Sequence, residues 1–125
     1  MDKTILIVDD EPDVLKMEVF RVRKLGYQVI TAVNGQEALA MIREKRPDLV
    51  LLDVRMPLME GTQVCSIVKD DESLKSTVII LVTASFDAVG NKAGQCKADD
   101  YVLKPFEPEE LCAKLVKFLG DAPGA

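Results

Sequence analysis

The sequence predicts an α/β fold: an open, doubly wound sandwich in which helices cover both faces of a five-stranded parallel sheet. Short apolar runs alternate with segments of helical spacing, which implies parallel strands joined by right-handed crossovers. Three of the runs are continuous aliphatics, as is typical of strands buried on both faces. The 125 residues are enough to bury a core without disulfides. We therefore expect one domain over residues 1–119 and a flexible C-terminal tail over residues 120–125.

Each element is supported by a local pattern. The apolar runs that we expect to be strands are residues 5–8, 27–30, 49–52, 78–82 and 101–103. The first helix is expected over residues 13–25. The second carries an apolar stripe of Ala38, Leu39 and Ile42 and ends before Pro47, because proline cannot continue a helix.

Two more helices are expected in the second half of the chain. The last one begins at Pro108, followed by two glutamates that suit the positive end of a helix, and its apolar stripe starts at Leu111. Residues 85–97 are expected to form the fourth helix. They include Gly90 and Gly94, and each glycine costs about 1 kcal/mol relative to alanine inside a helix. This helix is therefore either easy to move or simply short, with Gly94 at its end.

The charge balance excludes some classes of partner. The chain has 21 acidic and 16 basic residues, a net charge of −5, which disfavours direct binding to nucleic acid or to an anionic membrane. It contains no apolar run of the roughly 20 residues that span a bilayer. We expect a cytoplasmic protein that binds Mg²⁺ or a basic protein surface.

The cysteines and the lack of histidine limit the kinds of reactive site that the chain can form. The three cysteines, Cys65, Cys96 and Cys112, are widely separated and are expected to be reduced, small apolar residues. The chain has no histidine, which excludes imidazole-based zinc sites, Ser-His and Cys-His pairs, and a phosphohistidine of its own. Its chemistry must use carboxylates, hydroxyls and lysine.

Polar residues follow four of the five expected strands. In doubly wound sheets, ligands bind at the carboxyl ends of the strands, near the point where the strand order reverses. The first strand leads to Asp9 and Asp10, the third to Asp53, the fourth to Thr83 and the fifth to Lys104. These side chains are therefore expected to converge at one edge of the sheet.

Three carboxylates at this edge require positive charge nearby. At ~4 Å and an effective dielectric near 20, each pair repels by on the order of 4 kcal/mol. A divalent cation together with Lys104 would balance them, and an all-oxygen site of this kind favours Mg²⁺ over Ca²⁺. Asp53 could then act as a nucleophile and form an acyl phosphate, with Thr83 and Lys104 contacting the phosphoryl oxygens.

The chain resembles the response-regulator receiver domains of two-component signalling. The resemblance is carried by four motifs in order: "ILIVDDEPDV", "LVLLDVRMPLMEG", "VIILVTA" and "ADDYVLKPF". It implies a flavodoxin-like sheet of order 2-1-3-4-5. It also implies that Asp53 accepts a phosphoryl group from a sensor histidine kinase or phosphotransfer protein. Mg²⁺ would be bound by Asp10, Asp53 and the backbone carbonyl of Arg55, while Asp9 acts through water.

The same resemblance implies a conformational switch. Thr83 would turn toward the phosphoryl group and Tyr101 would move from an outward to an inward position. The surface of the fourth helix, fifth strand and fifth helix would change and alter the binding of a downstream protein target, with the chain a monomer or a phosphorylation-dependent dimer. Such a protein is not an enzyme, except that it promotes its own phosphorylation and dephosphorylation. Phosphate would bias a two-state equilibrium by several kcal/mol of differential contact.

Three residues depart from the family pattern. Lys97 stands before "ADDY", where the family usually has glycine, so the turn there could differ. Glu18 and Arg21 lie on the first helix at positions where apolar residues are expected. They form either an ordinary i, i+3 surface pair or part of a docking face for the kinase.

Two other functions fit the same residues less well. A magnesium-dependent phosphatase of the haloacid dehalogenase type needs a second acid two residues after its nucleophile, where this chain has Arg55. A nucleotide or flavin binder needs glycines or small hydroxyl residues after the first strand, where this chain has acids. A receiver-like scaffold regulated by protein contact without phosphorylation remains the alternative. The chain could be a stand-alone regulator or a receiver excised from a longer protein.

Overall fold

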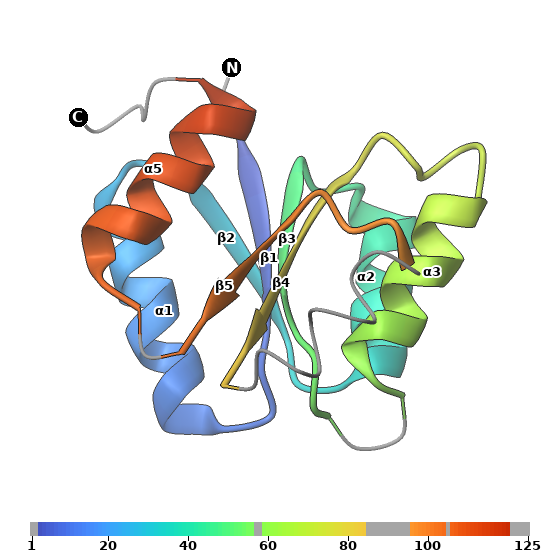
Figure 1. Cartoon of the computed structure of the whole chain (residues 1–125), viewed down its shortest axis with the longest axis horizontal. Coiled ribbons are helices and arrows are strands. Elements are labelled where there is room, and N and C mark those ends of the chain that lie inside the picture. The colour runs from blue at the N-terminus through green and yellow to red at the C-terminus, as the bar shows by residue number, and fades with distance from the viewer. Residues whose placement is uncertain (1–2, 57–58, 85–95, 105, 121–125) are drawn as a thin grey trace.

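A computed structural model describes residues 3–56, 59–84, 96–104 and 106–120 (Figure 1). Most of the expected fourth helix, with Gly90 and Gly94, lies outside the described residues, as does nearly all of the expected C-terminal tail. No helix of the described part of the chain has the length and apolar character needed to cross a membrane.

The sheet has the predicted order and is parallel throughout. Its strands are β1 (Thr4–Val8), β2 (Gln28–Ala32), β3 (Leu49–Asp53), β4 (Val78–Thr83) and β5 (Asp100–Leu103), in the order β2-β1-β3-β4-β5. The helices are α1 (Pro12–Lys24), α2 (Gly35–Lys45), α3 (Gly61–Asp70) and α5 (Pro108–Leu119). Every expected strand is confirmed, with differences of one or two residues at the ends.

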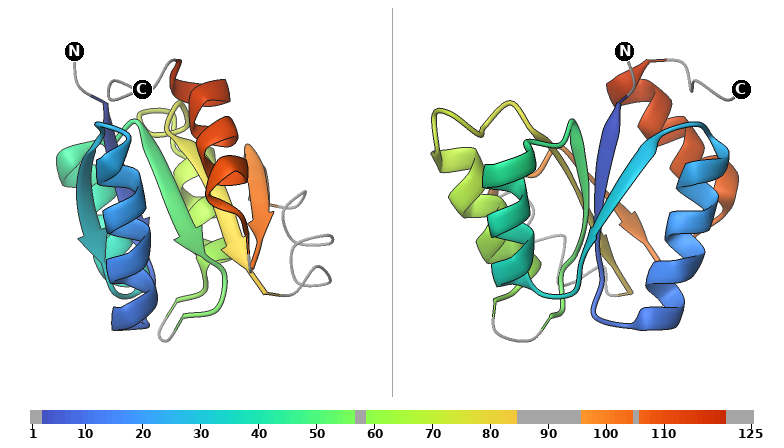
Figure 2. Two further views of the ribbon diagram at one scale, coloured as in Figure 1. Left: turned by 90° about the vertical axis from the view of Figure 1, so that its left-hand side faces the viewer. Right: turned by 180° about the vertical axis from the view of Figure 1, so that it is seen from behind.

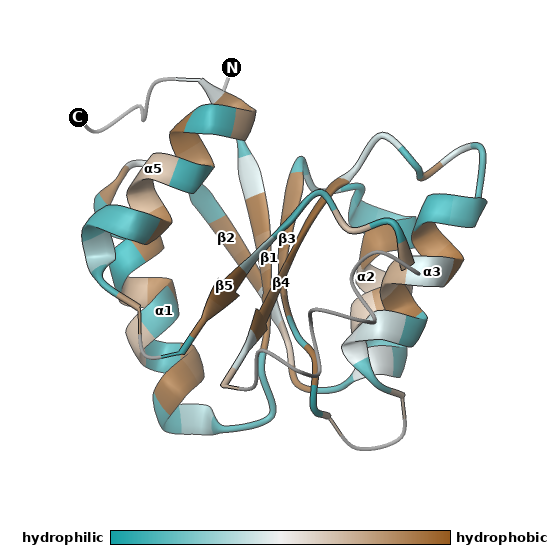
Figure 3. Ribbon diagram, viewed as in Figure 1, coloured by the Kyte–Doolittle hydropathy of each residue, from teal (hydrophilic) through white to brown (hydrophobic). Residues whose placement is uncertain are grey.

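Helices cover both faces of the sheet, as predicted (Figures 1 and 2). Alternate residues of β1 point to opposite sides: Leu6 joins an apolar cluster with α2 and α3, and Ile7 joins a second cluster with α1 and α5. The central strand β3 is buried along its whole length. Figure 3 shows the mostly apolar strands between helices that carry both polar and apolar residues. The core therefore consists of two layers of apolar side chains, one on each face of the sheet.

Local capping accounts for the ends of several helices. The Asn34 side chain accepts a hydrogen bond of 2.8 Å from the Glu37 N–H at the start of α2. Helix α2 ends before Pro47, and Arg46 there adopts a left-handed backbone with φ of 47°. Helix α5 begins at Pro108, as expected. Helix α3 begins at Gly61.

The turn before β5 keeps the geometry that glycine would favour. Lys97 has φ of 63°, in the left-handed region, although a lysine side chain is disfavoured there by about 1 kcal/mol or more. The replacement of the usual glycine therefore leaves the turn in place and adds backbone strain to it.

Candidate functional site

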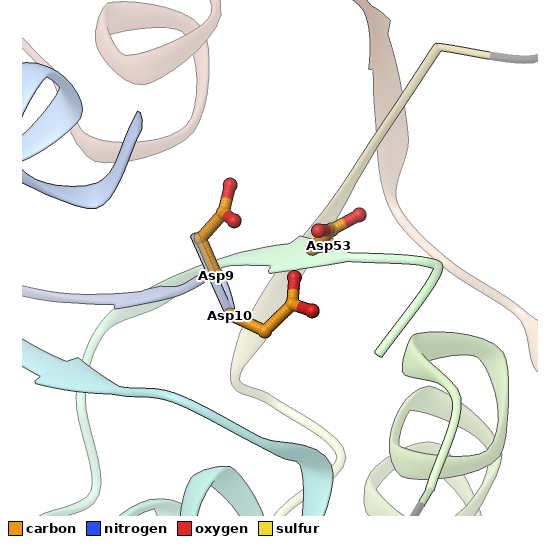
Figure 4. A group of neighbouring side chains, drawn as sticks. All are labelled: Asp9, Asp10 and Asp53. Carbon is orange, nitrogen blue, oxygen red and sulfur yellow. The ribbon is translucent and has the colours of Figure 1, made fainter. Parts of the chain in front are cut away.

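Three aspartates meet where β1 and β3 end. Asp9 and Asp10 follow β1, Asp53 is the last residue of the adjacent strand β3, and Figure 4 shows their carboxyl groups at this edge of the sheet. Each carboxylate offers an oxygen that lies within 4.8 Å of the other two. Asp9 and Asp53 are buried, whereas Asp10 is exposed. The expected convergence of these acids is present.

Lys104 provides the positive charge next to the cluster. Its Nζ donates a hydrogen bond of 3.0 Å to Oδ2 of Asp9 and lies 4.0 Å from Oδ2 of Asp53. The other Asp9 oxygen accepts a hydrogen bond of 2.9 Å from the Glu11 N–H. Burial lowers the pKa of Lys104, but the hydrogen bond to Asp9 and the negative charges of Asp53 and Asp9 together outweigh this effect and raise the pKa, so the ammonium form is favoured.

Burial dominates the electrostatics of Asp53. Burial raises its pKa to about 6; Lys104 opposes that rise and the charge of Asp9 adds to it. One carboxylate oxygen accepts a hydrogen bond of 3.2 Å from the Arg55 N–H, which favours the ionised form. Near neutral pH the carboxyl group is mostly ionised and can act as a nucleophile.

The remaining predicted residues lie on β4 and β5. Thr83 is buried at the end of β4 and pairs in register with Leu103; its backbone oxygen accepts a hydrogen bond of 2.8 Å from the Lys104 N–H. This bond aligns the ends of the two strands. Tyr101 on β5 has 37% of its surface exposed, an outward position. The inward movement of Tyr101 and the metal contact of the Arg55 carbonyl stay predictions.

Gly61 supports the site and was not identified from the sequence as a site residue. Its N–H donates a hydrogen bond of 2.9 Å to the Val54 carbonyl, so the start of α3 lies directly against the end of β3. A β-carbon at position 61 would overlap the backbone carbonyl of Asp53. Only glycine fits without displacing the strand that carries Asp53. The "MEG" motif contained this signal, but nothing in a single sequence shows which backbone approaches it.

The prediction that Glu18 belongs to a surface pair is wrong. Its residue is only 5% exposed, and no hydrogen bond or ion pair joins it to the half-buried Arg21. Glu18 instead faces the acidic site from α1. Burial, followed by the charge of Asp9, raises its pKa to about 7. The helical spacing correctly predicted that Glu18 lies on the face of α1 where apolar residues are expected. That face is buried at this position.

The acidic cluster fits a hard divalent cation. Its three groups are carboxylates, the ligands that Mg²⁺ prefers, and the described part of the chain brings no thiolate or imidazole to them. Burial is the main cause of the raised pKa of Asp53, and the charges of Asp9 and Asp10 add to it against the opposing effect of Lys104. A divalent cation would favour the ionised form of these acids.

The sequence of this chain is similar to those of known proteins with the same fold. The family model of the response regulator receiver domain matches residues 5–116. The DNA-binding response regulator MtrA of Mycolicibacterium smegmatis is 40% identical over 116 residues, covering 92% of this chain and 50% of MtrA. The chain thus spans about half the length of this relative.

Two solved structures show the same fold. The chemotaxis protein CheY4 of Vibrio cholerae has a TM-score of 0.87 and 31% identity, covering 95% of this chain and all of CheY4. The receiver domain of a Pseudomonas aeruginosa sensor histidine kinase has a TM-score of 0.89 and 28% identity, covering 97% of this chain and 100% of that one. That structure holds a magnesium ion in its active site cleft. The chain described here belongs to the response regulator receiver domain family.

Proposed function

We propose that this chain is a switch in which Asp53 accepts a phosphoryl group from the phosphohistidine of a sensor histidine kinase or phosphotransfer protein. The observation that carries the proposal is the cluster of Asp9, Asp10 and Asp53, with oxygens within 4.8 Å of one another and Lys104 beside it. The donor histidine lies outside this sequence, which contains no histidine.

In the proposed reaction, an Asp53 carboxylate oxygen attacks phosphorus. The new O–P bond forms as the N–P bond of the donor breaks, and the imidazole leaves with the electron pair of that bond. Asp53 gives up no proton, since it reacts in the ionised form. Lys104 is 4.0 Å from Asp53 and would interact with the transferred oxygens, as would the hydroxyl of Thr83.

We propose that Asp10, Asp53 and the Arg55 carbonyl hold Mg²⁺, with Asp9 acting through water. The bound cation would neutralise the phosphoryl oxygens during transfer. Asp9 already accepts hydrogen bonds from Lys104 and from the Glu11 N–H, which supports an indirect role for it.

Phosphorylation would change the surface around β5 and α5. Thr83 and Tyr101 are the proposed switch residues, and the exposed position of Tyr101 is consistent with the unphosphorylated state of such a switch. The proposed output is binding of a downstream protein by residues 1–119, without direct contact of this acidic chain with nucleic acid and without catalysis on other substrates. MtrA is a DNA-binding regulator about twice as long as this chain, so any DNA binding is proposed to require a segment other than this one.

The test is phosphorylation by acetyl phosphate with Mg²⁺, followed by intact-protein mass spectrometry. We expect one phosphoryl group per chain, none after chelation of Mg²⁺, and none in the Asp53→Asn variant. Asp13→Asn, which removes an exposed carboxylate from α1, is the matched control and should react normally. Unchanged incorporation in Asp53→Asn rejects the assignment. A folded wild-type protein that stays unmodified favours the scaffold alternative.

A further inference from the structure

Two of the three cysteines contact each other beneath α3. Cys65 of α3 donates a hydrogen bond of 3.3 Å from its Sγ to the backbone carbonyl of Cys96, which lies 31 positions further along the chain. Burial raises the pKa of the Cys65 thiol, and a hydrogen bond with the Cys96 side chain raises it further. The two thiols are therefore neighbours, although the sequence gives no sign of their pairing.

Both thiols are buried in the apolar cluster between the sheet and the helices α2 and α3. Cys65 has none of its surface exposed and Cys96 only 2%. Cys112 is half-buried on α5, which covers the other face of the sheet (Figure 2). All three are free thiols. The first two therefore form a pair from which the sheet separates the third.

Two ion pairs hold α3 against the turn before β5, which carries Cys96. Nζ of Lys69 on α3 lies 2.6 Å from Oδ2 of Asp99. Nζ of Lys97 lies 3.7 Å from Oδ1 of Asp70. The first pair is the stronger constraint, because the Lys69 side chain is only 9% exposed and also donates a hydrogen bond of 2.6 Å to the Thr77 carbonyl. These contacts keep the two thiols at close range.

We propose that Cys65 and Cys96 are a redox-active dithiol that a hydroperoxide closes to a disulfide, tying α3 to the turn before β5. In the first step, the sulfur of one deprotonated thiol attacks an oxygen of hydrogen peroxide. The O–O bond breaks, hydroxide leaves and takes up the thiol proton as water, and a sulfenic acid remains. In the second step, the other sulfur attacks the sulfenic sulfur. An S–S bond forms, the S–O bond breaks, and hydroxide leaves with the second thiol proton as water.

The burial of the pair determines how it reacts. A buried thiol with a raised pKa contains little thiolate, so the first step is slow compared with that of an exposed, activated cysteine. The second step is fast, because the partner sulfur is already in contact. The sulfenic acid is consumed before it can be oxidised further, and oxidation stops at the disulfide, which a reductant returns to two thiols.

The disulfide would act on the proposed switch, and in this respect the inference rests on the proposed function. Cys96 lies five residues before Tyr101, a proposed switch residue. Contact between the two cysteines accompanies the outward position of Tyr101 in this structure. A covalent bond added to this arrangement would favour it over one in which the segment leading into β5 moves. Under the proposed function the phosphoryl group favours the second arrangement, so the oxidised chain would accept it less readily.

The test is oxidation of the folded Cys112→Ser protein with hydrogen peroxide, followed by unfolding and alkylation with N-ethylmaleimide. We expect two labels per chain before oxidation and none after it, with both restored by dithiothreitol. Tryptic digestion without reduction should yield residues 56–69 joined to residues 93–97. Sulfinic or sulfonic acids in place of this crosslink overturn the proposal, as do two labels that persist until the exposed Met17 is fully oxidised.

The wild-type protein tests whether the fold selects the pair. Its three labels should fall to one, carried by Cys112. In urea the folded contact is lost, and loop closure favours a bond between Cys96 and Cys112, which are closer in the sequence than Cys65 and Cys96. A crosslink to Cys112 in the folded chain would show that the contact beneath α3 does not direct the oxidation, and would overturn the proposal.

Phosphorylation separates this inference from the proposed function. Acetyl phosphate with Mg²⁺ should modify the oxidised Cys112→Ser protein more slowly than the reduced one, and dithiothreitol should restore the rate. Equal rates reject the effect on the switch. If the crosslink forms but neither form is phosphorylated, the dithiol stands and the proposed function fails. If the reduced protein is phosphorylated but no crosslink forms, the dithiol is rejected and the proposed function stands.

Discussion

Replacing Glu18 by glutamine is expected to change how stability depends on pH. The pKa of this buried carboxyl rises from 4.5 to about 7 in the folded protein, so the folded state holds a proton that the unfolded state releases. Stability therefore falls by about 3 kcal/mol as the pH rises through this interval, because each unit of difference between the two pKa values corresponds to about 1.4 kcal/mol. Glutamine cannot ionise, and the variant is spared this loss.

Urea unfolding of both proteins at about pH 5 and about pH 8, with chelator present, measures this effect. We expect the stability of Glu18→Gln relative to the wild type to increase by about 3 kcal/mol between the two conditions. Glu44→Gln, which removes a carboxylate that is exposed on α2, controls for the loss of a surface charge and should show little change. A difference between Glu18→Gln and the wild type that is the same at both pH values would refute the reasoning.

Two further predictions concern the turn before β5 and the phosphoacceptor. Lys97→Gly should stabilise the protein by about 1 kcal/mol in urea unfolding, because it removes the left-handed lysine; Lys97→Ala keeps the backbone strain, and an equal gain in both variants would contradict this explanation. Phosphorylation by acetyl phosphate should decline as the pH falls through about 6 at low Mg²⁺, because burial raises the pKa of Asp53 and protonation removes the nucleophile. Higher Mg²⁺ should move the midpoint of that decline to lower pH, and a midpoint that stays fixed would argue against direct binding of the metal by Asp53.

The sheet was predictable because its strands carry strong local signals. Continuous aliphatic runs such as β3 are buried, and parallel strands bring their carboxyl ends to one edge, so the sequence alone predicts that Asp10, Asp53 and Lys104 lie together. The order of the strands came from the family resemblance. The spacing of residues alone does not determine which strands are neighbours.

The features that escaped prediction depend on contacts between distant segments. Glu18 looked like a surface residue because charged side chains usually are, and its burial depends on how α1 lies against the ends of β1 and β5. Gly61 is required because the Asp53 carbonyl approaches it, a contact that the sequence does not reveal. Lys97 was recognised as unusual, but the retention of the left-handed turn could only be seen in the backbone.

The hydrogen bond between Lys104 and Asp9 joins residues that are 95 positions apart in the sequence. Asp9 follows β1, which is second in the order of the sheet, and Lys104 follows β5 at its edge. During synthesis the three aspartates are made early, and Lys104 reaches them only when β5 has paired with β4. A chain still growing on the ribosome therefore has these acids without Lys104. Under the proposed function, Asp53 would become able to accept a phosphoryl group only after the whole domain has been made.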